Sequence, residues 1–227
     1  MNPDFWQERW QKNEIGFHQQ EINAHLQDYW PRLGVAGDGL VFVPLCGKSH
    51  DLLWLRARGH EVLGVELSPI AVRDFFRENT LQPQVSRQRA FERCAADGLS
   101  ILCGDFFDLT SEDLKGVAGV YDRASLIAMP PDMRPRYAAH LAAILPKGAA
   151  ILLVTMEYRQ AEMSGPPFSV SEDEVRTLYE KRYDVTRLFT KDILAENPRF
   201  RERGLSALSE KVYQLVPRNQ YPESEFR

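Results

Sequence analysis

One stretch near the start of the chain, residues 40–49, limits the possible folds more than any other part of the sequence. Residues 40–43 are a short run of bulky apolar side chains, as in a buried parallel strand. Pro44 has no N–H and ends the strand, and Gly47 permits a tight turn. A helical pattern follows, and after it a second strand that ends in Glu66, 19 residues beyond the glycine. The sequence therefore predicts a strand–turn–helix–strand unit with an acid at its end.

This outline is typical of nucleotide-binding units, because a carboxylate at the end of the second strand can accept hydrogen bonds from both hydroxyls of a ribose. An ordinary unit of this kind with a surface glutamate gives the same pattern, so that alternative stays open. Two phosphate-binding motifs are excluded. A P-loop needs a glycine where Phe42 stands, and the dinucleotide fingerprint needs glycines where Pro44 and Leu45 stand. The loop suits a nucleoside without phosphates, and S-adenosylmethionine fits that description.

Composition narrows the class of protein. The chain has 227 residues, of which 44% are hydrophobic and 26% charged, and a net charge of −4, which predicts a soluble protein that does not bind nucleic acid. Three cysteines without C-x-x-C spacing indicate reduced thiols in the cytoplasm. No apolar run is long enough for a membrane span, and no metal-ligand spacing occurs. We expect a single domain over residues 1–218, a disordered tail over 219–227, and a monomer.

Residues 1–30 contain an unusual density of aromatic side chains, among them Trp6, Trp10 and Phe17. Such an N-terminal arm can pack on the domain as additional core, or it can cover a ligand as a lid. Both interpretations remain open at this level.

The rest of the chain alternates strands and helices. Apolar runs predict further strands at 99–103, 117–121 and 149–156, and alternating patterns at 183–189 and 211–216 predict an antiparallel pair at the sheet edge. The polar stretch 79–98 predicts an irregular insertion with a short helix at 90–96. The expected fold is α/β: a doubly wound, Rossmann-like sheet, mostly parallel, with an antiparallel C-terminal edge pair.

Two more strand ends carry polar residues where open α/β sheets place ligands. Asp105 and Phe106 follow the predicted strand at 99–103; the carboxylate can hold an adenine amino group, or it can cap a turn. Asp122 and Arg123 follow the strand at 117–121, where the arginine can face a ligand or simply pair with Asp122.

Several motifs together resemble the thiopurine S-methyltransferase family, whose members are class I S-adenosylmethionine-dependent methyltransferases, and its bacterial members in particular. The resemblance runs from about residue 4 to residue 217. The motifs are Trp6-Gln7-Glu8-Arg9-Trp10, Gly16-Phe17-His18-Gln19, Phe42-Val43-Pro44-Leu45-Cys46-Gly47-Lys48, Gly64-Val65-Glu66, Asp122-Arg123-Ala124 and Gly165-Pro166-Pro167-Phe168.

The resemblance implies S-adenosylmethionine as cofactor and assigns roles to matching positions. Trp10 would cover the cofactor, Leu45 and Gly47 would line its methionine tail, Glu66 would bind the ribose, and Asp105 with Phe106 would meet the adenine. The acceptor pocket would be formed by Phe17, Pro167, Phe168, Arg123 and Arg199. Arg123 would serve both ends of the site, and Arg199 lies in the segment that matches the family least well.

The implied reaction is in-line transfer of a methyl group to an aromatic or heterocyclic thiol, with selenium and tellurium compounds as further acceptors. Arg123 is the candidate catalytic residue, because a guanidinium favours the thiolate that attacks. His18 is either a proton acceptor or a structural residue of the arm. One alternative is a nicotinamide-dependent dehydrogenase, which would explain Glu66 but not the single-glycine loop. A second is a non-catalytic nucleoside-binding module. A third is a nucleic-acid methyltransferase, but the polar residue that such enzymes place before Pro166 to hold a flipped base is missing.

Overall fold

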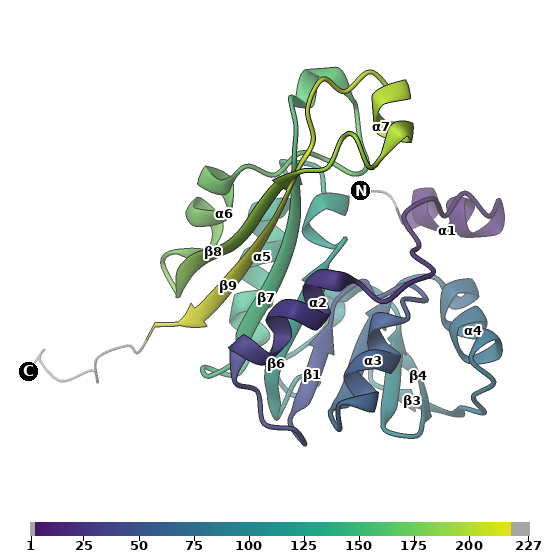
Figure 1. The fold of residues 1–227 in the computed structure, drawn as a ribbon. Coiled ribbons are helices and arrows are strands. Elements are labelled where there is room, and N and C mark those ends of the chain that lie inside the picture. The colour runs from purple at the N-terminus through teal and green to yellow at the C-terminus, as the bar shows by residue number, and fades with distance from the viewer. Residues whose placement is uncertain (1–2, 219–227) are drawn as a thin grey trace, which may run out of the picture.

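A computed structural model describes residues 3–218, which form a nine-stranded sheet with helices on both faces (Figure 1). The strand order is β3-β4-β5-β2-β1-β6-β7-β9-β8. The predicted tail 219–227 lies outside the described residues. The structure therefore confirms the predicted fold class, and the differences lie at the edges of the sheet.

The five central strands are parallel. They are β5 (Leu99–Cys103), β2 (Glu61–Glu66), β1 (Leu40–Val43), β6 (Val117–Arg123) and β7 (Ala150–Glu157). From β1 the chain adds β2 and then β5 on one side, and later adds β6 and β7 on the other side. The strand order therefore reverses between β1 and β6, the kind of position where doubly wound sheets place their ligands. All five strands were predicted, because strands covered on both faces are nearly continuous apolar runs.

Antiparallel strands extend both edges of this central sheet. On one side β9 (Ser209–Pro217) pairs with β7, and β8 (Tyr183–Asp192) lies outermost, as predicted. On the other side β3 (Gln84–Gln88) and β4 (Phe91–Ala96) form a hairpin that pairs with β5. The predicted helix at 90–96 is wrong. Such a short helix gains little from its own hydrogen bonds, whereas pairing with two neighbours satisfies the whole backbone of β4.

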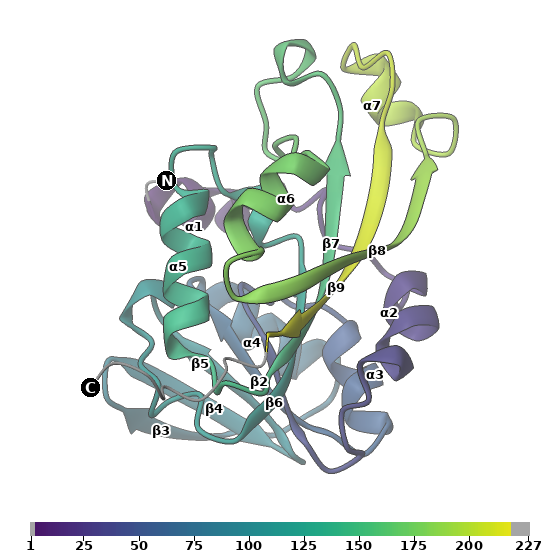
Figure 2. The same ribbon diagram turned by 90° about the vertical axis from the view of Figure 1, so that its left-hand side faces the viewer.

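Two helical layers cover the sheet (Figure 2). One face carries α2 (Ala24–Tyr29), α3 (Asp51–Ala57) and α4 (Pro69–Glu78), which pack Leu52 and Phe75 against it. The other carries α5 (Arg134–Ile144) and α6 (Glu172–Tyr179), with Tyr137 and Val175 in the second core. Each layer fixes one side of the strands, so the loops at the carboxyl ends start from a rigid base.

The remaining helices, α1 (Pro3–Gln11) and α7 (Pro198–Glu202), lie at the carboxyl-end side of the sheet (Figure 1). The segment with α7 has a small apolar cluster of its own, in which Phe200 and Leu208 pack against Tyr158. Single turns of 3-10 helix occur at Trp30–Leu33, Phe106–Asp108, Leu126–Ala128 and Gln160–Glu162. Over residues 3–218, the helices are all too short or too polar to cross a bilayer.

Candidate active site

A cavity of about 780 Å³ opens at the carboxyl ends of the central strands, beneath α1 and beside α7. It is lined by the arm, by the loops after β1, β2, β5, β6 and β7, and by α7. Ten of the eleven site residues expected from the sequence line it: Trp10, Phe17, Leu45, Gly47, Glu66, Asp105, Phe106, Arg123, Pro167 and Arg199. Residues far apart in the chain are thus brought to one site.

The loop after β1 has an unusual backbone. Leu45 and Gly47 both have left-handed conformations, with φ angles of 46° and 54°. The indole of Trp10 lies so near Gly47 that a Cβ atom there would be 3.3 Å from the ring. The glycine therefore serves both the turn and the close approach of the arm.

Glu66 ends β2 at the floor of this loop. Its Oε2 accepts a hydrogen bond from the Gly47 N–H at 2.9 Å, and its Oε1 accepts one from the Ser68 N–H at 2.7 Å. Burial raises the pKa of Glu66, and these backbone donors oppose that rise. Each carboxylate oxygen can accept a further bond, so the residue fits a ligand that offers hydroxyl groups, such as a ribose.

Asp105 and Phe106 stand side by side in the adjacent loop. Asp105 Oδ1 accepts a hydrogen bond from the Phe107 N–H at 2.9 Å, so the predicted turn cap is confirmed. The carboxylate also lines the cavity, and its second oxygen is not used by the cap. Phe106 is buried against Tyr137, with ring centroids 4.7 Å apart, and contributes an apolar wall beside the carboxylate.

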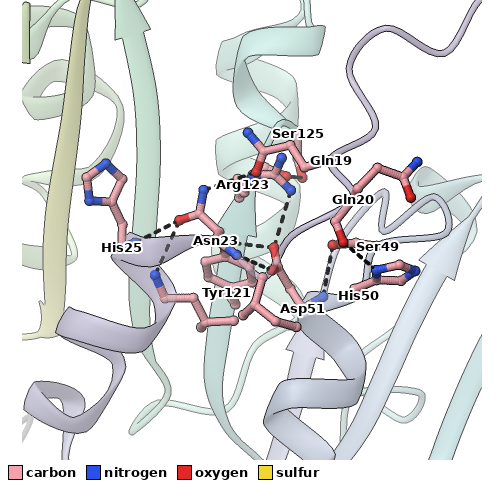
Figure 3. Close-up of polar contacts among 12 residues, drawn as sticks. Gln19, Gln20, Asn23, His25, Ser49, His50, Asp51, Tyr121, Arg123 and Ser125 are labelled. Carbon is pink, nitrogen blue, oxygen red and sulfur yellow. Dashed lines mark hydrogen bonds and ion pairs between the residues drawn. The ribbon is translucent and has the colours of Figure 1, made fainter. Parts of the chain in front are cut away.

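The pair Asp122 and Arg123 separates at the end of β6. Asp122 is fully buried and accepts a hydrogen bond from the Tyr137 hydroxyl at 2.8 Å. Arg123 turns to the cavity and pairs with Asp51, with 3.2 Å between Nη1 and Oδ2 (Figure 3). The alternative that Arg123 pairs with Asp122 is therefore wrong, because neighbouring residues of a strand point to opposite faces. Asp51 was missed; an acid in the first turn of the helix after the loop was its only signal.

The arm and α7 close the cavity together. Phe17 packs edge-on against both Trp6 and Trp10, at 5.6 Å between ring centroids in each pair. Arg199 Nη1 donates a hydrogen bond to the Gly16 carbonyl at 2.5 Å. Trp10 is nearly buried and also lines the cavity. These contacts confirm that the aromatic arm packs on the domain. That it covers a ligand as a lid stays a prediction.

Two residues of this region differ from expectation. Phe168 is the expected site residue that does not line the cavity: its N–H binds the Ile127 carbonyl at 2.7 Å, and its ring lies over Gly165. Phe200 was missed and lines the cavity from α7. Its only signal was an apolar residue among the arginines at 199, 201 and 203.

His18 lies in the arm against His50, with ring centroids 5.7 Å apart, and lines the cavity. Burial lowers its pKa, and the nearby positive charge of Lys48 adds to this effect. The ring is therefore neutral at neutral pH. That state is compatible with both readings of the residue, a proton acceptor and a structural part of the arm.

The family model for thiopurine S-methyltransferases matches residues 1–218. Among curated proteins, the thiopurine S-methyltransferase of Nitrosospira multiformis is 54% identical over 218 residues, which cover 96% of this chain and 99% of that protein. The enzyme of the same name from Azotobacter vinelandii is 52% identical over 218 residues, which cover 96% of this chain and all of that protein (100%).

Solved structures give the same fold at low identity. The 1,6-didemethyltoxoflavin-N1-methyltransferase of Burkholderia thailandensis, solved with S-adenosylhomocysteine, superimposes with a TM-score of 0.61 at 14% identity, over 94% of this chain and 87% of that chain. A SAM-dependent methyltransferase from Anabaena variabilis gives a TM-score of 0.61 at 13% identity, over 96% of each chain.

Proposed function

Because the chain belongs to the thiopurine S-methyltransferase family and is therefore a methyltransferase, we propose that its cavity binds S-adenosylmethionine and an aromatic or heterocyclic thiol together. The observation that carries this proposal is the Glu66 carboxylate, buried at the cavity floor and bonded to Gly47 in a loop without phosphate-binding glycines. A dehydrogenase or a non-catalytic module is disfavoured, since the family consists of methyltransferases.

The cofactor end of the cavity is assigned to the β1, β2 and β5 loops. Glu66 would accept the ribose hydroxyls, and Asp105 with Phe106 would hold the adenine by its amino group and its face. Leu45 and Gly47 would line the amino-acid tail. Trp10 would lie over the cofactor, a position supported by its contact with Gly47.

The acceptor end is assigned to Phe17, Pro167, Arg123 and Arg199, to which the structure adds Phe200. Arg123 would also reach the cofactor, and so serve both ends of the cavity. The walls there are aromatic, and the two guanidinium groups favour an acceptor that carries negative charge on sulfur. Phe168, which does not line the cavity, would act only by packing on Gly165 in the loop that carries Pro167. Selenium and tellurium compounds belong to the same proposal, since their anions share the size and softness of a thiolate.

The bound cofactor supplies a methyl group on a positively charged sulfur, a carbon already activated for transfer. The protein therefore has to align the acceptor and to exclude water. The arm and α7 would exclude water by covering the cavity. Arg123 would align the acceptor and favour its thiolate form, so the proposal needs no protein base.

Calorimetric titration with S-adenosylhomocysteine, with NADH in parallel, tests the cofactor. Micromolar binding of the first and none of the second is expected, and binding of NADH alone would contradict the proposal. A methyl-transfer assay with a thiopurine, a thiophenol and a selenol then tests the acceptor. Transfer to the oxygen or nitrogen analogues but to none of these would overturn the assignment of a sulfur or selenium acceptor.

We also propose that the protein is a monomer and that it acts in the cytoplasm. Among the described residues, the exposed large apolar side chains are Val85 on the edge strand β3 and Val216 on β9, next to the opposite edge, so they form no common patch. The cysteines are unpaired thiols, which suits a reducing compartment. Light scattering after size exclusion tests the first point, and cell fractionation the second.

A further inference from the structure

Asp51 stands at a junction of three parts of the molecule (Figure 3). It begins α3, and its side chain is only 2% exposed. Its Oδ1 accepts a hydrogen bond from the Asn23 N–H at 2.8 Å, and its Oδ2 accepts bonds from the Tyr121 hydroxyl at 3.1 Å and from Arg123 Nη1 at 3.2 Å. One buried carboxylate thus binds the arm and β6 at the same time.

For Arg123 this contact decides the direction of the guanidinium. An arginine at the open end of a strand has many rotamers, and most would leave the cavity for solvent. The buried negative charge of Asp51 requires a positive partner, and Arg123 is the cation that pairs with it. With Nη1 held there, and with the side chain 12% exposed, the rest of the planar group faces the cavity.

For the arm the same carboxylate is an anchor. Asn23 caps α2 by accepting bonds from the N–H groups of His25 and Leu26, so its own N–H is left for Asp51. Next to Asp51, His50 donates from Nδ1 to the Gln20 carbonyl at 2.8 Å. Segment 20–23 is therefore fixed to the start of α3 at two points. The arm residues that cover the cavity, Phe17 and His18 among them, precede this anchor directly.

We propose that Asp51 is a positioning residue for methyl transfer, which holds the Arg123 guanidinium toward the acceptor sulfur while the arm is docked. The inference rests on the proposed function, in which Arg123 faces the acceptor. In this proposal Asp51 itself contacts neither the cofactor nor the acceptor. Loss of its charge therefore acts on the acceptor step through Arg123 and leaves the proposed cofactor contacts of Glu66, Asp105 and Phe106 intact.

The first test is Asp51→Asn, which keeps an oxygen for the Asn23 N–H but removes the charge. We expect kcat/KM for a thiophenol acceptor to fall about 10- to 100-fold, as for a displaced catalytic group. The dissociation constant of S-adenosylhomocysteine is expected to change by less than about threefold, since that complex lacks the step that Arg123 serves. The acid limb of kcat against pH is expected to move to higher pH, because the bound thiol ionises less readily without the directed guanidinium.

Asp113→Asn is the matched control. Asp113 is another buried aspartate that pairs with an arginine, Arg89, but it lies outside the cavity. Its substitution is expected to lower the melting temperature without altering either the pH profile or kcat/KM. If both variants lose activity in parallel with stability, Asp51 is merely structural and the inference is wrong.

A double-mutant cycle with Arg123→Gln decides whether Asp51 acts through the arginine. The effect of Asp51→Asn is expected to disappear almost completely in the Arg123→Gln background. Additive losses would overturn the inference. Should Asp51→Asn not fold, Asp51→Glu carries the same cycle, because it keeps the charge and displaces it by one methylene. Failure of the proposed function is a separate result: the wild-type protein would then methylate no thiol at all.

Discussion

At the scale of single residues, the Glu66 carboxylate combines a structural role with the ligand role that we propose for it. It orders the β1 loop through Gly47 and presents its remaining acceptor positions to the cavity. For Glu66→Gln we expect S-adenosylhomocysteine to bind about 10- to 100-fold more weakly, since a hydrogen bond to a charged group contributes about 1.5–3 kcal/mol. Titration calorimetry measures this.

Glu61→Gln is the control for that experiment. Glu61 begins the same strand, β2, but is exposed and does not line the cavity. The Glu61→Gln variant is expected to bind S-adenosylhomocysteine with the affinity of the wild type. Equal losses in the two variants would show that the strand, and not the ribose contact, is affected.

Asp122 makes stability depend on pH. Burial raises the pKa of its carboxyl from 3.8 to about 6, and the Tyr137 hydroxyl partly opposes this. The folded state therefore holds the proton longer than the unfolded state. The stabilisation that the protonated Asp122 gives the folded protein is fully present below about pH 4. It is lost as pH rises through about 6, by up to roughly 3 kcal/mol.

The variant Asp122→Asn removes this titration. It is expected to raise the free energy of unfolding relative to the wild type at pH 7.5 and to make little difference at pH 4. Urea unfolding at the two pH values measures both. A variant that loses stability equally at pH 4 and pH 7.5 would contradict the argument, because the buried charge would then not be the cause.

At the scale of elements, the loop after β1 depends on a glycine that no other residue replaces without strain. In Gly47→Ala the left-handed backbone costs about 1–2 kcal/mol, and the new methyl group presses on Trp10. We expect a melting temperature lower by about 2–8 °C and S-adenosylhomocysteine bound about five- to tenfold more weakly. In Gly37→Ala, where no atom lies within 4 Å of the added methyl group, neither value is expected to change.

The contact between α7 and the arm lies at the end of the cavity that we assign to the acceptor. Arg199→Gln removes the charged donor to the Gly16 carbonyl, so we expect the acceptor KM to rise about fivefold and the arm to be cleaved faster by trypsin. The neighbouring Arg201 is exposed on the same helix and does not line the cavity. Arg201→Gln is expected to behave like the wild type, and equal KM values in the two variants would argue against the contact as a closure.

At the scale of the whole molecule, the cavity joins segments from both ends of the chain, so an occupant stabilises the arm, the central loops and α7 together. S-adenosylhomocysteine at 100 times its dissociation constant is expected to add about 2.7 kcal/mol. For a chain of this size the melting temperature then rises by about 5–10 °C. Differential scanning calorimetry measures this, and the same concentration of NADH is expected to produce no shift.

The central fold was predictable because its signals are local. Buried parallel strands are apolar runs, and parallel strands end at one edge of the sheet, so Leu45, Gly47, Glu66, Asp105 and Arg123 had to come together there. The hairpin of β3 and β4 was not predictable in this way. Four of the five residues of β3 are exposed, so its sequence is polar and carries no strand pattern.

The pairing of side chains was the second feature that could not be predicted from the sequence. Arg123 pairs with Asp51, 72 positions away, and not with its neighbour Asp122; Arg199 meets Gly16 across 183 positions. Phe168, expected in the pocket, packs over Gly165 instead. The sequence by itself determined the five central strands, the C-terminal pair of strands, the loop after β1 and the edge of the sheet where the candidate site lies. Only the tertiary structure decided which charges meet and which rings face the cavity, because those choices depend on distances between segments that no local pattern encodes.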